Sequence, residues 1–321
     1  MKNNKKGSSK KPWILPRHRF LRRVLGFVFL PYVKSKYHVK ISTYNKKDNR
    51  PMLILYNHQT AFDQFFVSGA FKNPIYHVAT EDIFSMGFLS KVIKYIVAPI
   101  PIKKQTTDAR AVINCIRVAK EGGAIALAPE GNRTYSGETV YIKPSITSLA
   151  RHLKLPIALF RIEGGYGVHP RWSNDVRKGK MTAGVSRVIE PEEYADLSDD
   201  ELYKLICDGL YQNEACADAE YRSPVLAEYL ERAIYVCPEC GLSEFHSAGD
   251  VIECKRCGKK ARYTTKKELV GVDSEFPFRF VKDWYDYQSN FVNELKLTDM
   301  PSKALYNEKV DLFEVDRKSV V

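Results

Sequence analysis

Between residues 51 and 190, short apolar runs alternate with helical patterns, and no other feature of the chain limits its possible folds as strongly. We expect strands at residues 52–56, 75–79, 96–102, 124–128, 157–160 and 184–189, with helices at residues 108–120 and 199–213. Such a succession is typical of βαβ units, in which a helix connects two parallel strands. The sequence therefore predicts an α/β fold with a mostly parallel central sheet flanked by helices.

The first 35 residues are distinguished by their positive charge. Residues 2–23 contain nine Lys or Arg residues and no acidic residue, within a chain of net charge +12. Such a basic N-terminus can be a solvated tail, a nucleic-acid arm or a contact with anionic lipid.

The segment from Arg17 to Leu30 lies between Pro16 and Pro31 and predicts an amphipathic helix. Its apolar face gathers Phe20, Leu21, Val24, Leu25, Phe27 and Val28, and its basic face gathers Arg19, Arg22 and Arg23. This pattern is typical of a helix in the membrane interface, and the alternative is a helix packed on its own domain. Its apolar run of about ten residues is half of the roughly twenty that a membrane span needs. No small-residue cleavage site of a signal peptide follows. We expect residues 1–35 to associate with a membrane surface.

Two polar loops follow predicted strands, at the edge where open α/β sheets bind their ligands. Asn57, His58 and Asp63 come directly after the first strand, and the loop at residues 129–134 follows a later one. A neutral imidazole can remove the proton of an attacking hydroxyl at cellular pH, while a nearby carboxylate orients the ring and stabilises the imidazolium. His58 and Asp63 are therefore the predicted catalytic pair.

These loops resemble two motifs of the glycerolipid acyltransferase family, which comprises the lysophosphatidic acid acyltransferases and their relatives. The family's Asn-His-x4-Asp motif is matched by Asn57, His58 and Asp63. Its Pro-Glu-Gly-Thr-Arg motif is matched at residues 129–133, where Asn132 replaces the threonine.

Two further motifs of the family are matched more loosely. An apolar strand ending in Arg resembles residues 100–104, where Lys104 stands at the arginine position, and an apolar run around a proline resembles residues 155–158. The resemblance covers about residues 36–215. It implies a glycerol-3-phosphate acyltransferase-like fold for a domain at residues 36–222.

The resemblance also implies which residues bind the substrate. Arg133 is suited to hold a phosphate through two parallel hydrogen bonds. Gly131 allows a close approach of the backbone, and Glu130 can accept a hydrogen bond from an acceptor hydroxyl. Lys104 is a second candidate phosphate contact, as a point charge rather than a planar fork, and its alternative is a solvated surface position.

A covalent acyl-enzyme is not indicated. The sequence contains no Gly-x-Ser-x-Gly elbow, and Cys115, Cys207 and Cys216 stand in helix-like patterns, where core packing is expected. Neither of the nucleotide-binding patterns G-x4-G-K-[ST] and G-x-G-x-x-G occurs. We therefore expect direct transfer from donor to acceptor.

Four cysteines predict a zinc ribbon at residues 235–262, within a C-terminal region at residues 223–321. They form the pattern C-x2-C-x13-C-x2-C, with a glycine after each pair: Cys237, Cys240, Cys254 and Cys257. Four thiolates close a tetrahedron around zinc and leave no open position, so the expected metal is structural and not catalytic. The alternative is a set of free or redox-active thiols.

The resemblance implies an O-acyltransferase of phospholipid biosynthesis. It would move a fatty acyl group from acyl-CoA or acyl carrier protein to a hydroxyl of a lysophospholipid, with 1-acylglycerol 3-phosphate as the expected acceptor. The alternatives are a zinc-ribbon nucleic-acid-binding protein and a non-catalytic lipid-binding relative. Nucleic-acid binding would not need the two motif loops, so we expect no nucleic-acid partner. The cysteine pattern and the lack of a secretion signal indicate a cytoplasmic protein, peripherally bound to the cytoplasmic face of an anionic membrane.

Overall fold

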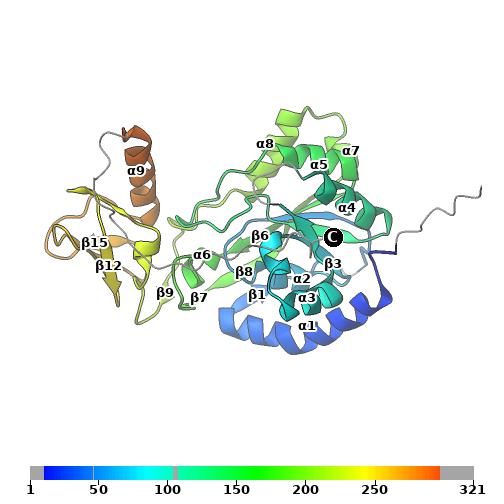
Figure 1. Cartoon of the computed structure of the whole chain (residues 1–321), viewed down its shortest axis with the longest axis horizontal. Coiled ribbons are helices and arrows are strands. Elements are labelled where there is room, and N and C mark those ends of the chain that lie inside the picture. Colours follow the sequence, from blue (N-terminus) through cyan, green and yellow to red (C-terminus); the bar gives the residue numbers. More distant parts are fainter. Residues whose placement is uncertain (1–10, 46, 104–107, 297–321) are drawn as a thin grey trace, which may run out of the picture.

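The computed structural model describes residues 11–45, 47–103 and 108–296. A larger α/β lobe contains both motif loops, and a smaller lobe at its side contains the paired cysteines (Figure 1). Lys104 and the basic residues before Lys11 lie outside the described residues. The chain end beyond residue 296 lies outside them as well.

The larger lobe is built on a seven-stranded sheet of order β1-β8-β6-β2-β5-β3-β4. Its strands are β1 (Val39–Ile41), β2 (Leu53–Tyr56), β3 (Ile75–Thr80), β4 (Ile100–Ile102), β5 (Ala124–Leu127), β6 (Ile157–Glu163) and β8 (Met181–Ile189). All neighbours are parallel except β6 and β8, which pair antiparallel. The predicted mostly parallel sheet is confirmed.

Helices cover both faces of this sheet (Figure 1). The helices are α1 (Pro16–Tyr37), α2 (Asp63–Ala70), α3 (Phe88–Val97), α4 (Ala109–Lys120), α5 (Ser145–Leu153), α8 (Asp199–Leu210) and the short η1 (Glu81–Phe84), α6 (Gly165–Val168) and α7 (Pro191–Tyr194). Ile54 and Tyr56 of β2 pack in one cluster with α1 and α2, while Leu53 and Leu55 pack in another with α4, α5 and α8. Because β2 is buried on both faces, its uninterrupted apolar sequence is explained.

Two local predictions are wrong at their boundaries. The strand expected at residues 96–102 begins only at Ile100, since Ile96 and Val97 end α3 and Ala98 adopts a left-handed backbone with φ of 42°. The first helix does not end at Pro31 but continues to Tyr37. Proline removes one helical hydrogen bond, the one to the carbonyl of Phe27 four residues earlier, and Phe27 is an exposed residue.

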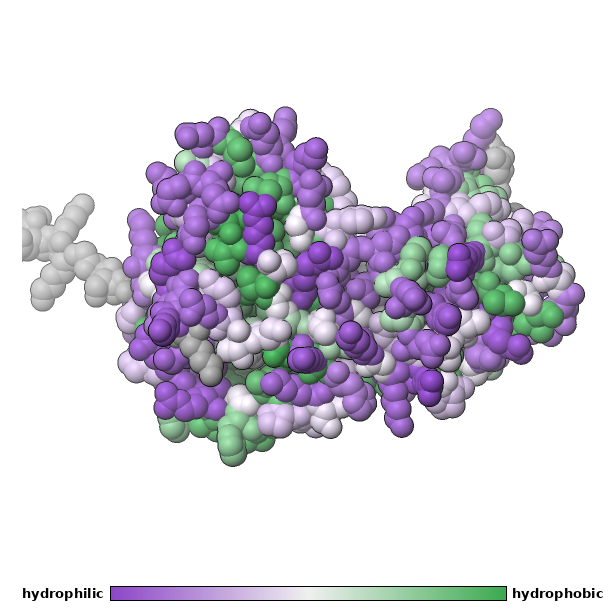
Figure 2. Space-filling model, turned by 180° about the vertical axis from the view of Figure 1, so that it is seen from behind, coloured by the Kyte–Doolittle hydropathy of each residue, from purple (hydrophilic) through white to green (hydrophobic). Residues whose placement is uncertain are grey.

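Helix α1 leaves most of its apolar face uncovered. Phe20, Phe27 and Val28 are 65%, 84% and 68% exposed. Apolar side chains gather along the lower edge of the larger lobe, where α1 lies (Figures 1 and 2). Arg22 points the other way and donates to backbone carbonyls at and just beyond the C-terminal end of α2, including that of Ser68 at 2.6 Å. The helix therefore packs on its domain partly through an arginine.

The smaller lobe is made of short antiparallel strands and one helix. Its elements are η2 (Leu230–Arg232), β10 (Val236–Cys237), β11 (Gly241–Leu242), β12 (Phe245–Ala248), β13 (Val251–Cys254), β14 (Lys260–Tyr263), β15 (Leu269–Gly271) and α9 (Val281–Glu294). Strands β7 (Lys178–Gly179) and β9 (Tyr221–Arg222) form a two-stranded pair beside it. The helix α9 was not predicted from the sequence. Its buried Trp284 packs edge-on against Phe245, so tertiary contacts stabilise it.

Candidate active site

The two residues of the predicted catalytic pair are in hydrogen-bonding contact. His58 lies in the loop after β2, and Asp63 is the first residue of α2. The distance from His58 Nδ1 to Asp63 Oδ2 is 2.8 Å. Since Nδ1 faces the carboxylate, Nε2 is the ring nitrogen available to a substrate. This geometry suits a histidine base oriented by an acid.

Asp63 is held by the loop that it follows. Its carboxylate is fully buried and accepts hydrogen bonds from the backbone of Gln59 at 2.7 Å, and from the backbone and hydroxyl of Thr60 at 2.9 and 2.7 Å. Its position at the N-terminus of α2 is also favoured by the helix dipole. The spacing of five residues to His58 thus lets the loop fold back over the first turn of the helix.

The two motif loops meet because β2 and β5 are neighbours in the sheet. Glu130 Oε1 accepts a hydrogen bond from the backbone N–H of His58 at 2.7 Å, and Oε2 accepts one from that of Val140 at 3.0 Å. Burial raises the pKa of Glu130 to about 7, although these two bonds oppose the shift. The Asn57 side chain binds both backbone groups of Ile162 on β6, at 2.8 and 2.9 Å. Both side chains therefore position His58 through the backbone.

The remaining substrate-binding candidates lie on the loop after β5, apart from Lys104. Gly131 has φ of +71°, a conformation that strains other residues, and an added Cβ would meet open space. Arg133 is half-buried, and burial, followed by the charge of Arg171, lowers its pKa. Lys104 lies outside the described residues, while its neighbour Lys103 lines the cavity that His58 also lines.

That cavity has a volume of about 1180 Å³. Its walls include the apolar Phe29 and Leu30 of α1 and Ile93 of α3, and also the charged Arg133. The volume exceeds the roughly 300–1,000 Å³ of typical small-ligand sites. The cavity can therefore receive a long apolar chain together with a charged group.

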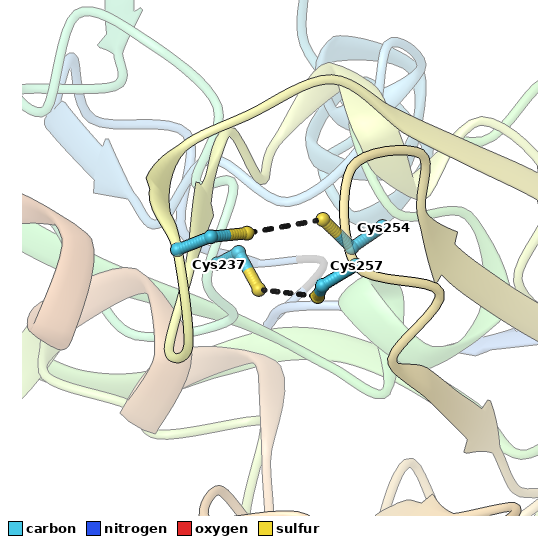
Figure 3. A group of neighbouring side chains, drawn as sticks. Cys237, Cys254 and Cys257 are labelled. Carbon is cyan, nitrogen blue, oxygen red and sulfur yellow. Dashed lines mark hydrogen bonds between the residues drawn. The ribbon is translucent and has the colours of Figure 1, made fainter.

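The four paired cysteines come together in the smaller lobe. Their sulfur atoms all lie within 4.8 Å of one another, with 3.6 Å between the sulfurs of Cys237 and Cys257 and 3.6 Å between those of Cys240 and Cys254. Figure 3 shows the side chain of Cys237 turned toward those of Cys254 and Cys257, which come from one turn on the opposite side of the cluster. A tetrahedron with Zn–S bonds of about 2.3 Å has edges of about 3.8 Å, so the cluster fits a zinc ion.

The other three cysteines do not form a site. Cys115 is buried in α4 and Cys207 is half-buried in α8, as expected. Cys216 is exposed in a loop, so the prediction of a helical core position is wrong for this residue. The helix predicted at 199–213 ends at Leu210, so its C-terminal boundary is wrong as well.

The arginine that lies beside Arg133 in the cavity was missed from the sequence. Arg171 lines the cavity with Arg133 but stands beyond the last of the family motifs. Its neighbour Trp172 is fully buried in the core of the smaller lobe. The position of Arg171 thus depends on residues far along the chain, and no local pattern marks it.

The histidine–aspartate pair thus lies at the carboxyl edge of the parallel sheet, beside a cavity that Arg133 also lines. Residues 37–162 match the family model described as Acyltransferase. This segment contains both motif loops, so the part of the chain that carries the motifs is an acyltransferase domain, as they predicted. The crystal structure of the 1-acyl-sn-glycerophosphate (LPA) acyltransferase PlsC from Thermotoga maritima is similar, with a TM-score of 0.49 and 18% sequence identity, over 60% of this chain and 75% of that one. No curated protein matches the chain.

None of the helices in the described part of the chain has the length and apolarity that a membrane crossing requires.

Proposed function

We propose that the protein transfers a fatty acyl group from a thioester donor, acyl-CoA or acyl carrier protein, to the free hydroxyl of 1-acylglycerol 3-phosphate in phospholipid biosynthesis. The observation that supports this most directly is the 2.8 Å contact between His58 and Asp63 at a large apolar cavity that also contains Arg133. The cavity offers room for acyl chains, a base for the hydroxyl and a cation for the phosphate.

In the proposed reaction, His58 Nε2 takes the proton of the acceptor hydroxyl while its oxygen attacks the thioester carbonyl carbon. The new C–O bond forms and the C–S bond breaks. The departing thiolate then receives the proton from the imidazolium, so no covalent enzyme intermediate is needed. Asp63 holds the ring and stabilises its positive charge, and Arg133 binds the phosphate through its planar fork. Glu130 and Gly131 shape the loop at the acceptor hydroxyl.

We also propose peripheral binding of the protein to the anionic cytoplasmic face of a membrane. The support is the uncovered apolar face of α1, with Phe27 as its most exposed member at 84%. The same helix lines the cavity through Phe29 and Leu30, so an acyl chain would have a short path from the bilayer. The proposed organisation is a membrane-associating segment at 1–35, a catalytic domain at 36–222 and a zinc-binding region from 223.

A radiolabelled acyl-transfer assay tests the function. Purified protein is given both donor types and a panel of acceptors: 1-acylglycerol 3-phosphate, other lysophospholipids and glycerol 3-phosphate. We expect transfer to 1-acylglycerol 3-phosphate and a kcat lower by about 10²-fold or more in His58→Ala. The matched control is His246→Ala, which removes an exposed histidine of the smaller lobe and should leave kcat unchanged. Activity of His58→Ala within a few-fold of wild type would rule out the proposed base.

A further inference from the structure

Two arginines share one wall of the cavity without a carboxylate partner. Arg133 and Arg171 both line it, and no ion pair among the described residues includes either of them. Asp63 is the acid that acts most strongly on Arg133, but its oxygens already accept bonds from His58 and from the loop. Two positive charges that are half-buried repel each other, and an anion bound between them would offset this repulsion.

The guanidinium of Arg171 is held in a definite place beside Arg133. Arg171 Nη1 donates to the backbone carbonyl of Arg133 at 2.8 Å. Its guanidinium carbon also lies 4.2 Å from the ring centroid of Tyr135, at stacking distance. One nitrogen is thus used for support, and the planar group still has other N–H donors for a ligand.

The surroundings of this pair are positive. His169 hydrogen bonds to Tyr37 at 3.1 Å, and burial, followed by the positive charges of Arg133 and Lys36, lowers its pKa to about 4. A histidine that stays neutral beside Arg133, Lys36 and Arg177 leaves the positive potential of these three cations to act on a ligand.

The smaller lobe fixes the segment that carries Arg171. Trp172 is fully buried against Tyr263, with ring centroids 5.6 Å apart. Arg177 lies over both rings, at 4.8 and 5.1 Å, and donates to the carbonyl of Leu226 at 2.6 Å. The cavity wall at Arg171 is therefore continuous with the core of the cysteine-bearing lobe.

We propose that Arg171 is a second phosphate-binding residue, which together with Arg133 selects acceptors with a terminal phosphate monoester. This inference rests on the proposed function. Arg171 supplies a second, planar cation for the phosphate, in the described part of the cavity. A monoester carries up to two negative charges and three free oxygens, enough for two guanidinium groups. A lysophospholipid with a diester head group offers one charge and two free oxygens, and is bound less well.

The test compares Arg171→Gln and Arg171→Lys with wild type in the acyl-transfer assay. We expect Arg171→Gln to raise the KM for 1-oleoylglycerol 3-phosphate by roughly 10- to 100-fold, the equivalent of one charged hydrogen bond. The KM for oleoyl-CoA should change little, and Arg171→Lys should lie between the two. Arg222→Gln is the matched control, because it removes the same charge from a side chain that is 76% exposed.

A second measurement separates binding from a disturbed loop. Inorganic phosphate should compete with the acceptor in wild type, and its inhibition constant should rise in Arg171→Gln and be partly restored in Arg171→Lys. Unchanged acceptor KM and unchanged phosphate inhibition in Arg171→Lys and Arg171→Gln would overturn the proposal. If Arg171→Gln does not fold, an unchanged acceptor KM in Arg171→Lys alone would overturn it. Wild-type protein that acylates no phosphate-bearing acceptor would instead refute the proposed function.

Discussion

Replacing Asp63 by Asn is the sharpest test of the catalytic geometry, because it keeps the shape of the side chain and removes its charge. Oδ2 accepts from His58 Nδ1 and from the backbone of Gln59, and Oδ1 accepts from the backbone and hydroxyl of Thr60. The amide NH2 has the fewest conflicts at the Oδ1 position, since the hydroxyl of Thr60 can turn and accept, and the backbone N–H of Thr60 also lies 3.0 Å from Oδ2. The imidazole is then still oriented by a neutral oxygen, but its positive charge has no counter-ion.

The expected decrease in kcat follows from the loss of this negative charge. A carboxylate that stabilises an imidazolium in a buried site contributes about 10²- to 10⁴-fold to kcat, which corresponds to about 3–5 kcal/mol of barrier. Folding should suffer less, because a charged hydrogen bond replaced by a neutral one costs about 1–2 kcal/mol. We therefore expect a variant that is folded, somewhat less stable and very slow.

The assay is steady-state acyl transfer, with urea unfolding followed in parallel. Asp283→Asn is the matched control: this acid lies in the first turn of α9 and accepts from the backbone of Phe280 at 2.9 Å, away from the cavity. The double variant with His58→Ala should be no slower than His58→Ala alone, because an orienting acid has no effect once the base is gone. A folded Asp63→Asn within about threefold of wild type, or losses that multiply in the double variant, would refute the reasoning.

Three further results are expected. Wild type should contain about one zinc per chain. Cys254→Ser should lower both the zinc content and the resistance of the smaller lobe to proteolysis. An unchanged digestion pattern would argue against a structural metal. Phe27→Glu places a charge on the apolar face of α1 and should weaken co-sedimentation with anionic vesicles, while acyl transfer to detergent-dispersed acceptor persists. If wild type and Phe27→Glu sediment equally, α1 has no membrane role. Because the pKa of Glu130 is raised to about 7 in the folded protein, its contribution to stability is complete below about pH 4.5 and is lost as the pH rises through 7. The difference in unfolding free energy between wild type and Glu130→Gln should therefore fall over that window, and a difference independent of pH would contradict the shift.

The sheet and both motif loops could be predicted from the sequence because they depend on local patterns. The apolar run of β2 ends at the polar Asn57, and α4 begins where Asp108 accepts from the backbone of Arg110 and Ala111. Gly122 follows the end of α4 with φ of +83°, as a helix-ending glycine does. The two loops meet because β2 and β5 are neighbours in the sheet, and this strand order was not predicted from the sequence.

The rest depends on contacts between distant residues, which local patterns do not reveal. Glu130 has a chemically reasonable role as a substrate contact, but its bond to the backbone of His58 joins residues 72 positions apart. Arg171 is positioned through Trp172 by residues of the smaller lobe. Helix α9 has a weak pattern of its own and is stabilised by the packing of Trp284.

The strand order also has a consequence for how the chain folds during synthesis. The first strand, β1, pairs with β8, so Val39 meets its partner Met181 only 142 residues later. At about 5–20 residues per second, the ribosome needs roughly 7–30 s to make the intervening chain. Through that interval β1 has no neighbour, and once β6 has been made it presents an open edge, which invites association with other chains, until β8 follows.

A fragment cut to the family-matched range, residues 37–162, would stay in this condition permanently, because it lacks the strand that joins β1 to β6. The sheet closes only when the chain has been made to Ile189, so the folding unit is longer than the segment by which the family is recognised.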